Sequence, residues 1–166
     1  MILKRNNVSD KNQIEIAYDL GLTVPEEYRE MYPNAIFGDK PSAGYGTQIQ
    51  KTEYSINNFF ETNNIRLYEE YYYIENENET KDFLENNVDN DILVCCHCKT
   101  LYDAPHADWG HMLLFETIEN DNVTLLDPGA KRNYEIIPLS KLVRAITIHG
   151  KENGAGFYLI RKLEKK

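Results

Sequence analysis

The sequence predicts an α+β fold, with helices in the N-terminal half and an antiparallel sheet in the C-terminal half. In the first half, apolar residues recur at helical spacing, as at Ile14, Ala17 and Leu20. In the second half, apolar residues alternate with polar ones or form short continuous runs, which is typical of strands. This segregation of helices and strands along the chain indicates the α+β class rather than alternating βαβ units.

The N-terminal half is expected to begin with residues 1–7 as the last turns of a helix. The next helix has Asp10 as a plausible N-cap, with Gln13 completing a capping box, and ends at Gly21. Prolines and glycines break up residues 32–50, so we expect a long irregular loop that exposes Tyr45. The remaining elements are a helix over 53–63, a tyrosine-rich strand over 65–74 and a helix over 79–88.

The C-terminal half is expected to supply most of the sheet. Residues 92–96 form a fully apolar run, which predicts a central strand. A loop over 100–108 leads into a hairpin over 109–128, and a short strand follows at 134–137. Pro138 is well placed to start a helix, and the last strand covers 156–160.

The hairpin carries the candidate chemistry. If Thr117 pairs with Val123 across a five-residue loop, Leu113 faces Asp127. His111 is then the diagonal neighbour of Asp127 on the same face, at about 7–8 Å between backbones. A carboxylate that orients an imidazole is two thirds of a nucleophilic triad. The alternative is a strand-end histidine and a turn-starting Asp-Pro that do not touch.

Length and composition limit the possible functions. A chain of 166 residues is most simply one domain over residues 1–166. The net charge of −9 and the lack of a basic stripe argue against nucleic-acid binding. There is no apolar run of about 18 residues, so no membrane span is expected. The three cysteines predict reduced thiols in the cytoplasm, and we expect no cofactor.

The segment Cys95-Cys96-His97-Cys98 invites a zinc interpretation that its geometry disfavours. All of these residues are expected in one strand-like segment, where neighbours point to opposite faces and cannot converge on one ion. Burial in an apolar strand raises the pKa of a thiol. We therefore expect these cysteines to be neither metal ligands nor a catalytic nucleophile.

The order of these features resembles a known family. Gly110-His111 on a strand, an acidic turn, and a strand ending in Asp127-Pro128 resemble the second half of papain-like cysteine peptidases, and most closely the bacterial bacteriocin-processing domains that cleave double-glycine leaders. Residues 12–21 look like the second helix of that family, and 92–96 fit the strand before its histidine strand.

The resemblance implies His111 as general base, Asp127 as its orienting partner and a peptide or protein substrate. Trp109, Tyr45 and Tyr102 are candidate aromatics of the cleft, with Gly110 beside them. In that family a cysteine opens the first helix and a glutamine lies a few residues before it, and neither has a match here. The sequence therefore predicts an incomplete triad, whose nucleophile either was lost from the gene or is encoded upstream of Met1.

Three functional hypotheses remain open from the sequence. The first is a cysteine-peptidase-like hydrolase. The second is a pseudoenzyme that keeps the cleft and binds an extended peptide. The third is an acidic interaction protein, such as an inhibitor or immunity-type partner of a basic toxin, suggested by the net charge of −9.

Overall fold

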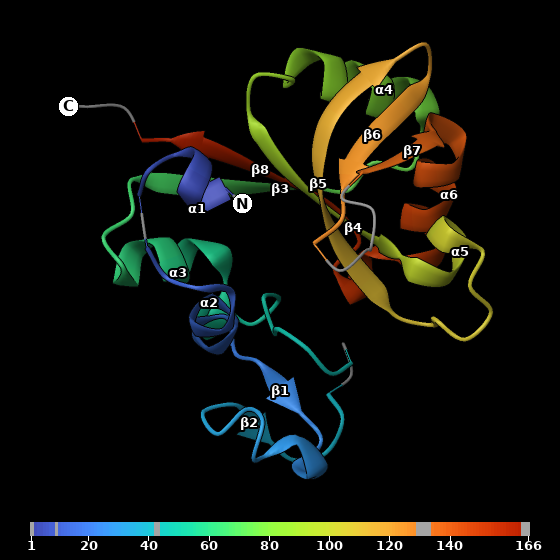
Figure 1. Ribbon diagram of the computed structural model, residues 1–166. Coiled ribbons are helices and arrows are strands. Elements are labelled where there is room, and N and C mark those ends of the chain that lie inside the picture. The colour runs from blue at the N-terminus through green and yellow to red at the C-terminus, as the bar shows by residue number, and fades with distance from the viewer. Residues whose placement is uncertain (1, 9, 42–43, 129–133, 164–166) are drawn as a thin grey trace. The chain divides into compact units, whose positions relative to one another are not determined.

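The computed structural model describes residues 2–8, 10–41, 44–128 and 134–163 (Figure 1). The chain divides into two compact units, which are described separately. The N-terminal unit comprises Met1–Tyr68 with Lys162–Lys166, and the C-terminal unit comprises Glu69–Arg161. The expectation of one domain over residues 1–166 stays a prediction.

The N-terminal unit contains short elements joined by irregular chain. Its helices and strands are α1 (Ile2–Arg5), α2 (Gln13–Asp19), β1 (Thr23–Val24), β2 (Ile36–Phe37) and α3 (Ile56–Thr62). The strands β1 and β2 pair in parallel, which the sequence did not predict. In the second half of the unit, Ile56, Phe59 and Phe60 of α3 are buried, as the apolar spacing predicted.

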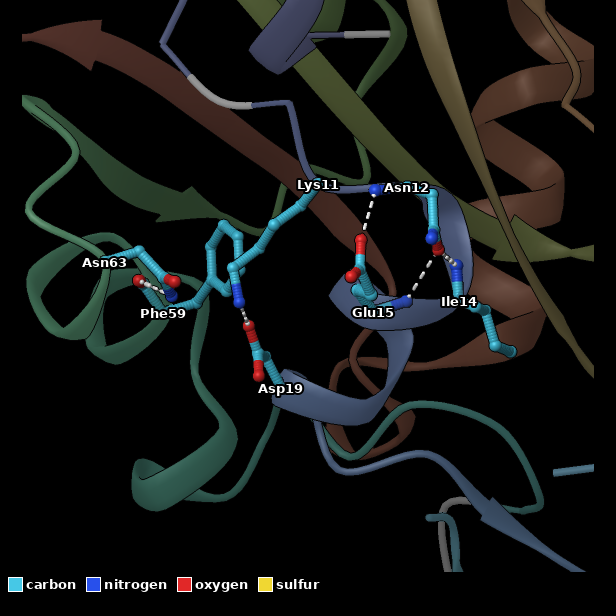
Figure 2. Close-up of polar contacts among 7 residues, drawn as sticks. All are labelled: Lys11, Asn12, Ile14, Glu15, Asp19, Phe59 and Asn63. Carbon is cyan, nitrogen blue, oxygen red and sulfur yellow. Dashed lines mark hydrogen bonds and ion pairs between the residues drawn. The ribbon is translucent and has the colours of Figure 1, made fainter. Parts of the chain in front are cut away.

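A capping box starts α2, but two residues later than predicted (Figure 2). The Asn12 side chain accepts hydrogen bonds from the backbone N–H groups of Ile14 and Glu15, both at 3.0 Å. The Glu15 carboxylate accepts one from the backbone N–H of Asn12 at 2.7 Å. The prediction of Asp10 and Gln13 was therefore wrong, because Asn12 and Glu15 place both side chains within reach of the unpaired N–H groups.

The C-terminal half of the chain supplies a six-stranded antiparallel sheet, so the predicted α+β class is confirmed. The strands follow the spatial order β3 (Leu67–Tyr72), β8 (Gly156–Lys162), β4 (Asp91–His97), β5 (Gly110–Glu119), β6 (Asn122–Leu126) and β7 (Tyr134–Pro138). The prediction of a central strand at 92–96 is also confirmed, since β4 lies between β8 and β5.

Three helices of the C-terminal unit cover one face of this sheet (Figure 1). They are α4 (Glu77–Asn86), α5 (Cys98–Tyr102) and α6 (Leu139–His149), and α6 begins directly after Pro138, as predicted. Their buried side chains form one core with the strands, and its members on β4 and β5 are Ile92, Val94, Cys96, Leu113 and Phe115. Within the described residues, no helix is long and apolar enough to cross a membrane.

The turn between β5 and β6 is tighter than the predicted five-residue loop. Glu119 pairs with Asn122, so only Asn120 and Asp121 form the turn, and both have positive φ values, 49° and 60°. This backbone twist suits a two-residue hairpin. The predicted pairing of Thr117 with Val123 was wrong, because Thr117 pairs with Thr124.

A β-bulge restores the register beyond the turn. It lies between Phe115 and Thr117, and Phe115 pairs with Leu125 as predicted. A bulge gives one strand an extra residue, so it shifts the facing side chains by one position. The shift keeps Leu113 and Phe115 in the core and places His111 on their face of the sheet.

Candidate functional site

His111 and Asp127 form a hydrogen-bonded pair at the end of the hairpin. His111 is the second residue of β5, and Asp127 directly follows β6. The His111 Nε2 atom lies 2.8 Å from Asp127 Oδ1. The Asp127 side chain is 3% exposed and the His111 side chain 25% exposed. The predicted contact is therefore confirmed, whereas its catalytic role stays a prediction.

Tyr102 contributes a third polar group to the same carboxylate. Its hydroxyl, carried by α5, donates a hydrogen bond to Asp127 Oδ2. Its ring lies edge-on to the His111 ring, with 6.0 Å between the ring centroids. Burial, and then the hydrogen bond to Asp127, raise the pKa of Tyr102. The phenol therefore keeps its proton and remains a donor.

The arrangement fixes which nitrogen of His111 can accept a proton. An ionised carboxylate only accepts hydrogen bonds, so Nε2 of His111 carries the hydrogen that points at Asp127. In the neutral ring, Nδ1 is then the acceptor. Within the described ranges, Nδ1 has no hydrogen-bond partner. The His111 side chain is 25% exposed, and its Nδ1 atom could accept a proton from a thiol or a hydrogen bond from a ligand.

The cysteines are close in sequence to the pair but are poor nucleophiles. Burial raises the pKa of Cys95 to about 12 and also raises that of Cys96. The pKa of Cys98 is raised by burial and by the negative charge of Asp127. No hydrogen bond joins Cys98 to His111 in the described part of the chain. An activated thiol would have a lowered pKa, so these three resemble structural cysteines.

The prediction that Cys98 lies in the same strand as Cys95 and Cys96 was wrong. It is the first residue of α5, a helix where the sequence analysis expected strand and then loop. Helix α5 has only five residues and ends at Asp103, which has a left-handed conformation with φ 54°. A helix this short is marginal without tertiary packing, so its sequence gives little signal.

A second histidine, His97, also contacts an aspartate, and it neighbours Cys96 and Gly110 on the strands next to the His111–Asp127 pair. His97 Nε2 is 3.0 Å from Asp108 Oδ1, and His97 Nδ1 is 2.8 Å from Thr100 Oγ1. The His97 ring stacks on His149, with 6.3 Å between centroids. Both nitrogens of His97 therefore have partners. Among the described residues, no three His, Cys, Asp or Glu side chains form a group that could hold a metal ion.

His149 lies at the C-terminal end of a helix, where a protonated imidazole would interact favourably with the helix dipole. His149 is indeed the last residue of α6, but burial and the neighbouring His97 lower its pKa. Burial thus outweighs the helix dipole, and the neutral imidazole is favoured.

The remaining predicted cleft residues have different surroundings. Gly110 lies directly under His149, since a Cβ atom on Gly110 would be 2.2 Å from His149 Nε2. Trp109 is exposed, and its carbonyl accepts a hydrogen bond from the Cys98 N–H at 2.9 Å. Tyr45 is exposed in the N-terminal unit, so its place in a cleft with His111 stays a prediction.

Tyr102 is the site residue whose role the sequence missed. It was noted only as a candidate cleft aromatic, and its contact with Asp127 depends on α5, which was not predicted. Comparison with known proteins adds no further assignment: no family model matches the chain, and no curated protein or solved structure gives a significant match.

Proposed function

We propose that this chain is a cysteine-peptidase-like domain of the papain-like kind that binds a peptide and carries only the base half of the catalytic machinery. His111 is the general-base residue and Asp127 its orienting partner. The proposal rests on one observation, the 2.8 Å contact between His111 Nε2 and the buried Asp127 Oδ1, which leaves Nδ1 available. The α+β architecture with the histidine on an antiparallel strand supports the same family.

A complete cysteine peptidase needs a thiolate within reach of the base. The base accepts the thiol proton, and the sulfur attacks the peptide carbonyl to form an acyl-enzyme. Cys95, Cys96 and Cys98 are the cysteines of this sequence, and each has a raised pKa. None of them suits the role of the nucleophile. The 166-residue chain is therefore expected to bind a peptide without cleaving it.

In this proposal His111 acts as a polar anchor for the bound peptide. Nδ1 accepts a hydrogen bond from a backbone N–H, while Asp127 holds the ring in one orientation. A hydrogen bond of this kind contributes about 0.5–1.5 kcal/mol, so its loss weakens binding by about 2- to 13-fold. The adjacent exposed indole of Trp109 supplies apolar contact area to the same ligand.

The experiment uses a fluorescently labelled synthetic peptide in which a leader ending in Gly-Gly precedes further residues. Fluorescence anisotropy measures binding, and mass spectrometry of the same samples measures cleavage. We expect saturable binding without cleavage, and weaker binding to the His111→Ala variant. The matched control is Asp108→Asn, which alters the other aspartate–histidine pair and should bind like the unmodified chain.

Two results would overturn the proposal. Cleavage that His111→Ala abolishes would mean that the chain does contain a working nucleophile. Failure of this peptide and of unrelated extended peptides to bind would remove the peptide-binding function and favour an acidic protein that binds a basic partner, as the net charge of −9 allows.

A further inference from the structure

We infer that Tyr102 is a positioning residue for the His111–Asp127 pair. Its hydroxyl fixes the Asp127 carboxylate so that Oδ1 stays on His111 Nε2. This inference rests on the proposed function, because it assigns a role in orienting the same base. It is based on the observation that the two oxygens of the carboxylate have different partners: Tyr102 binds Oδ2 and His111 binds Oδ1.

The two hydrogen bonds to the Asp127 carboxylate are important because this carboxylate is buried. The Asp127 side chain is 3% exposed, so water is largely excluded as a partner for its oxygens. A buried carboxylate is costly unless hydrogen-bond donors from the protein replace water. Tyr102 brings such a donor from α5, whereas His111 brings one from β5. The carboxylate is thus held between two elements that are separate in sequence.

The chemistry of the phenol suits a permanent donor. Burial and the adjacent carboxylate raise the pKa of Tyr102, so its hydroxyl does not ionise in the range where an imidazole titrates. A lysine donor is not needed for this purpose, since the neutral hydroxyl donates without adding charge. Tyr102 can therefore hold Asp127 in both protonation states of His111.

The geometry also limits how Asp127 can move. Rotation of the carboxylate about its Cβ–Cγ bond would exchange Oδ1 and Oδ2 and would break both hydrogen bonds at intermediate angles. The Tyr102 ring, edge-on to the His111 ring with centroids 6.0 Å apart, also limits the space in which the imidazole can turn. Removing only the hydroxyl should leave the ring packing intact and free the carboxylate.

The test compares the unmodified chain with Tyr102→Phe by NMR, using the Nε2–H proton of His111 as the signal. In the unmodified chain this proton is expected to exchange slowly with water, because it points at a buried carboxylate. In Tyr102→Phe its exchange should be about tenfold faster, which corresponds to the loss of about one hydrogen bond. Tyr134→Phe is the matched control, because Tyr134 is exposed on β7. It should leave the exchange unchanged.

A double-mutant cycle separates positioning from a general loss of stability. If Tyr102 acts through Asp127, adding Tyr102→Phe to Asp127→Ala, a variant without a side-chain group for Tyr102 to position, should not change the exchange of the His111 Nε2–H proton further. Equal effects in both backgrounds would refute the inference, as would unchanged exchange in Tyr102→Phe with the slow His111 proton still present. That second outcome leaves the proposed function standing. Absence of the slow proton in the unmodified chain would instead overturn the pair itself, and the proposed function with it.

Discussion

Asp127→Asn is the most informative single change, because it preserves the shape of the side chain and removes its charge. The carboxylate accepts hydrogen bonds from both His111 and Tyr102. An amide has one oxygen and one NH₂ group, so it cannot accept from both donors through separate oxygens. If the amide oxygen faces Tyr102, its NH₂ group faces His111 Nε2, which must then become the acceptor.

The expected cost follows from these two contacts. A hydrogen bond to a charged group contributes about 1.5–3 kcal/mol and a neutral one about 0.5–1.5 kcal/mol. Replacing two charge-assisted bonds by neutral ones, partly offset by the cheaper burial of an amide, should lower the free energy of unfolding by about 1–3 kcal/mol. The hydrogen of the neutral His111 ring should also move to Nδ1, which removes the acceptor that the proposed peptide contact needs.

The assay combines urea unfolding, followed by circular dichroism, with nitrogen NMR of the His111 ring. Asp108→Asn provides the control, because it alters a similar contact of 3.0 Å to His97 whose aspartate side chain is 81% exposed. An exposed ion pair contributes about 0–1 kcal/mol, so the control should change stability little. Equal losses of stability in the two variants, or an unchanged His111 tautomer in Asp127→Asn, would refute the reasoning.

Three further outcomes are expected. Gly110→Ala should destabilise the chain by about 1–3 kcal/mol in urea unfolding, because the new Cβ would overlap the His149 ring, and adding His149→Ala should reduce that loss. Burial and His97 lower the pKa of His149 below its ordinary value of 6.5, so the unfolded state binds this proton more readily. The contribution of neutral His149 to the free energy of unfolding is therefore fully present above pH 6.5 and is lost as the pH falls through the lowered pKa of the folded chain. The variant His149→Gln should flatten the decline in the free energy of unfolding between about pH 7 and pH 5. Finally, Cys95 and Cys96 should resist alkylation at about pH 8 until urea is added, and rapid labelling of either in the folded chain would contradict their raised pKa values.

Elements with strong local patterns were predictable from the sequence. The apolar run at 92–96 became the central strand β4, and the helix after Pro138 became α6. In both cases the local signal and the burial agree: the run is apolar throughout, and the α6 stripe includes the fully buried Leu142 and Ile146. Such agreement between sequence pattern and tertiary packing is what makes an element predictable.

Features that depend on tertiary contacts were not predictable in the same way. Helix α5 is too short to be stable by itself, and the contact between Tyr102 and Asp127 exists only because α5 forms. The pKa of His149 likewise depends on burial and on a stacked neighbour, His97, which is distant in sequence. None of these relationships has a spacing that a single sequence displays.

The His111–Asp127 contact was predicted correctly, although the turn at the other end of the same hairpin was not. The tighter turn moves the pairing of Thr117 from Val123 to Thr124. By itself, this one-residue shift would have placed the side chains at the His111 end of β5 on the opposite face of the sheet. The bulge between Phe115 and Thr117 reverses that change before Phe115 is reached. The reason is energetic, because a one-residue slip would expose side chains that now belong to the core. The core thus determines the face on which the histidine lies, and for this site the apolar alternation of β5 was a better guide than the chemistry of its turn.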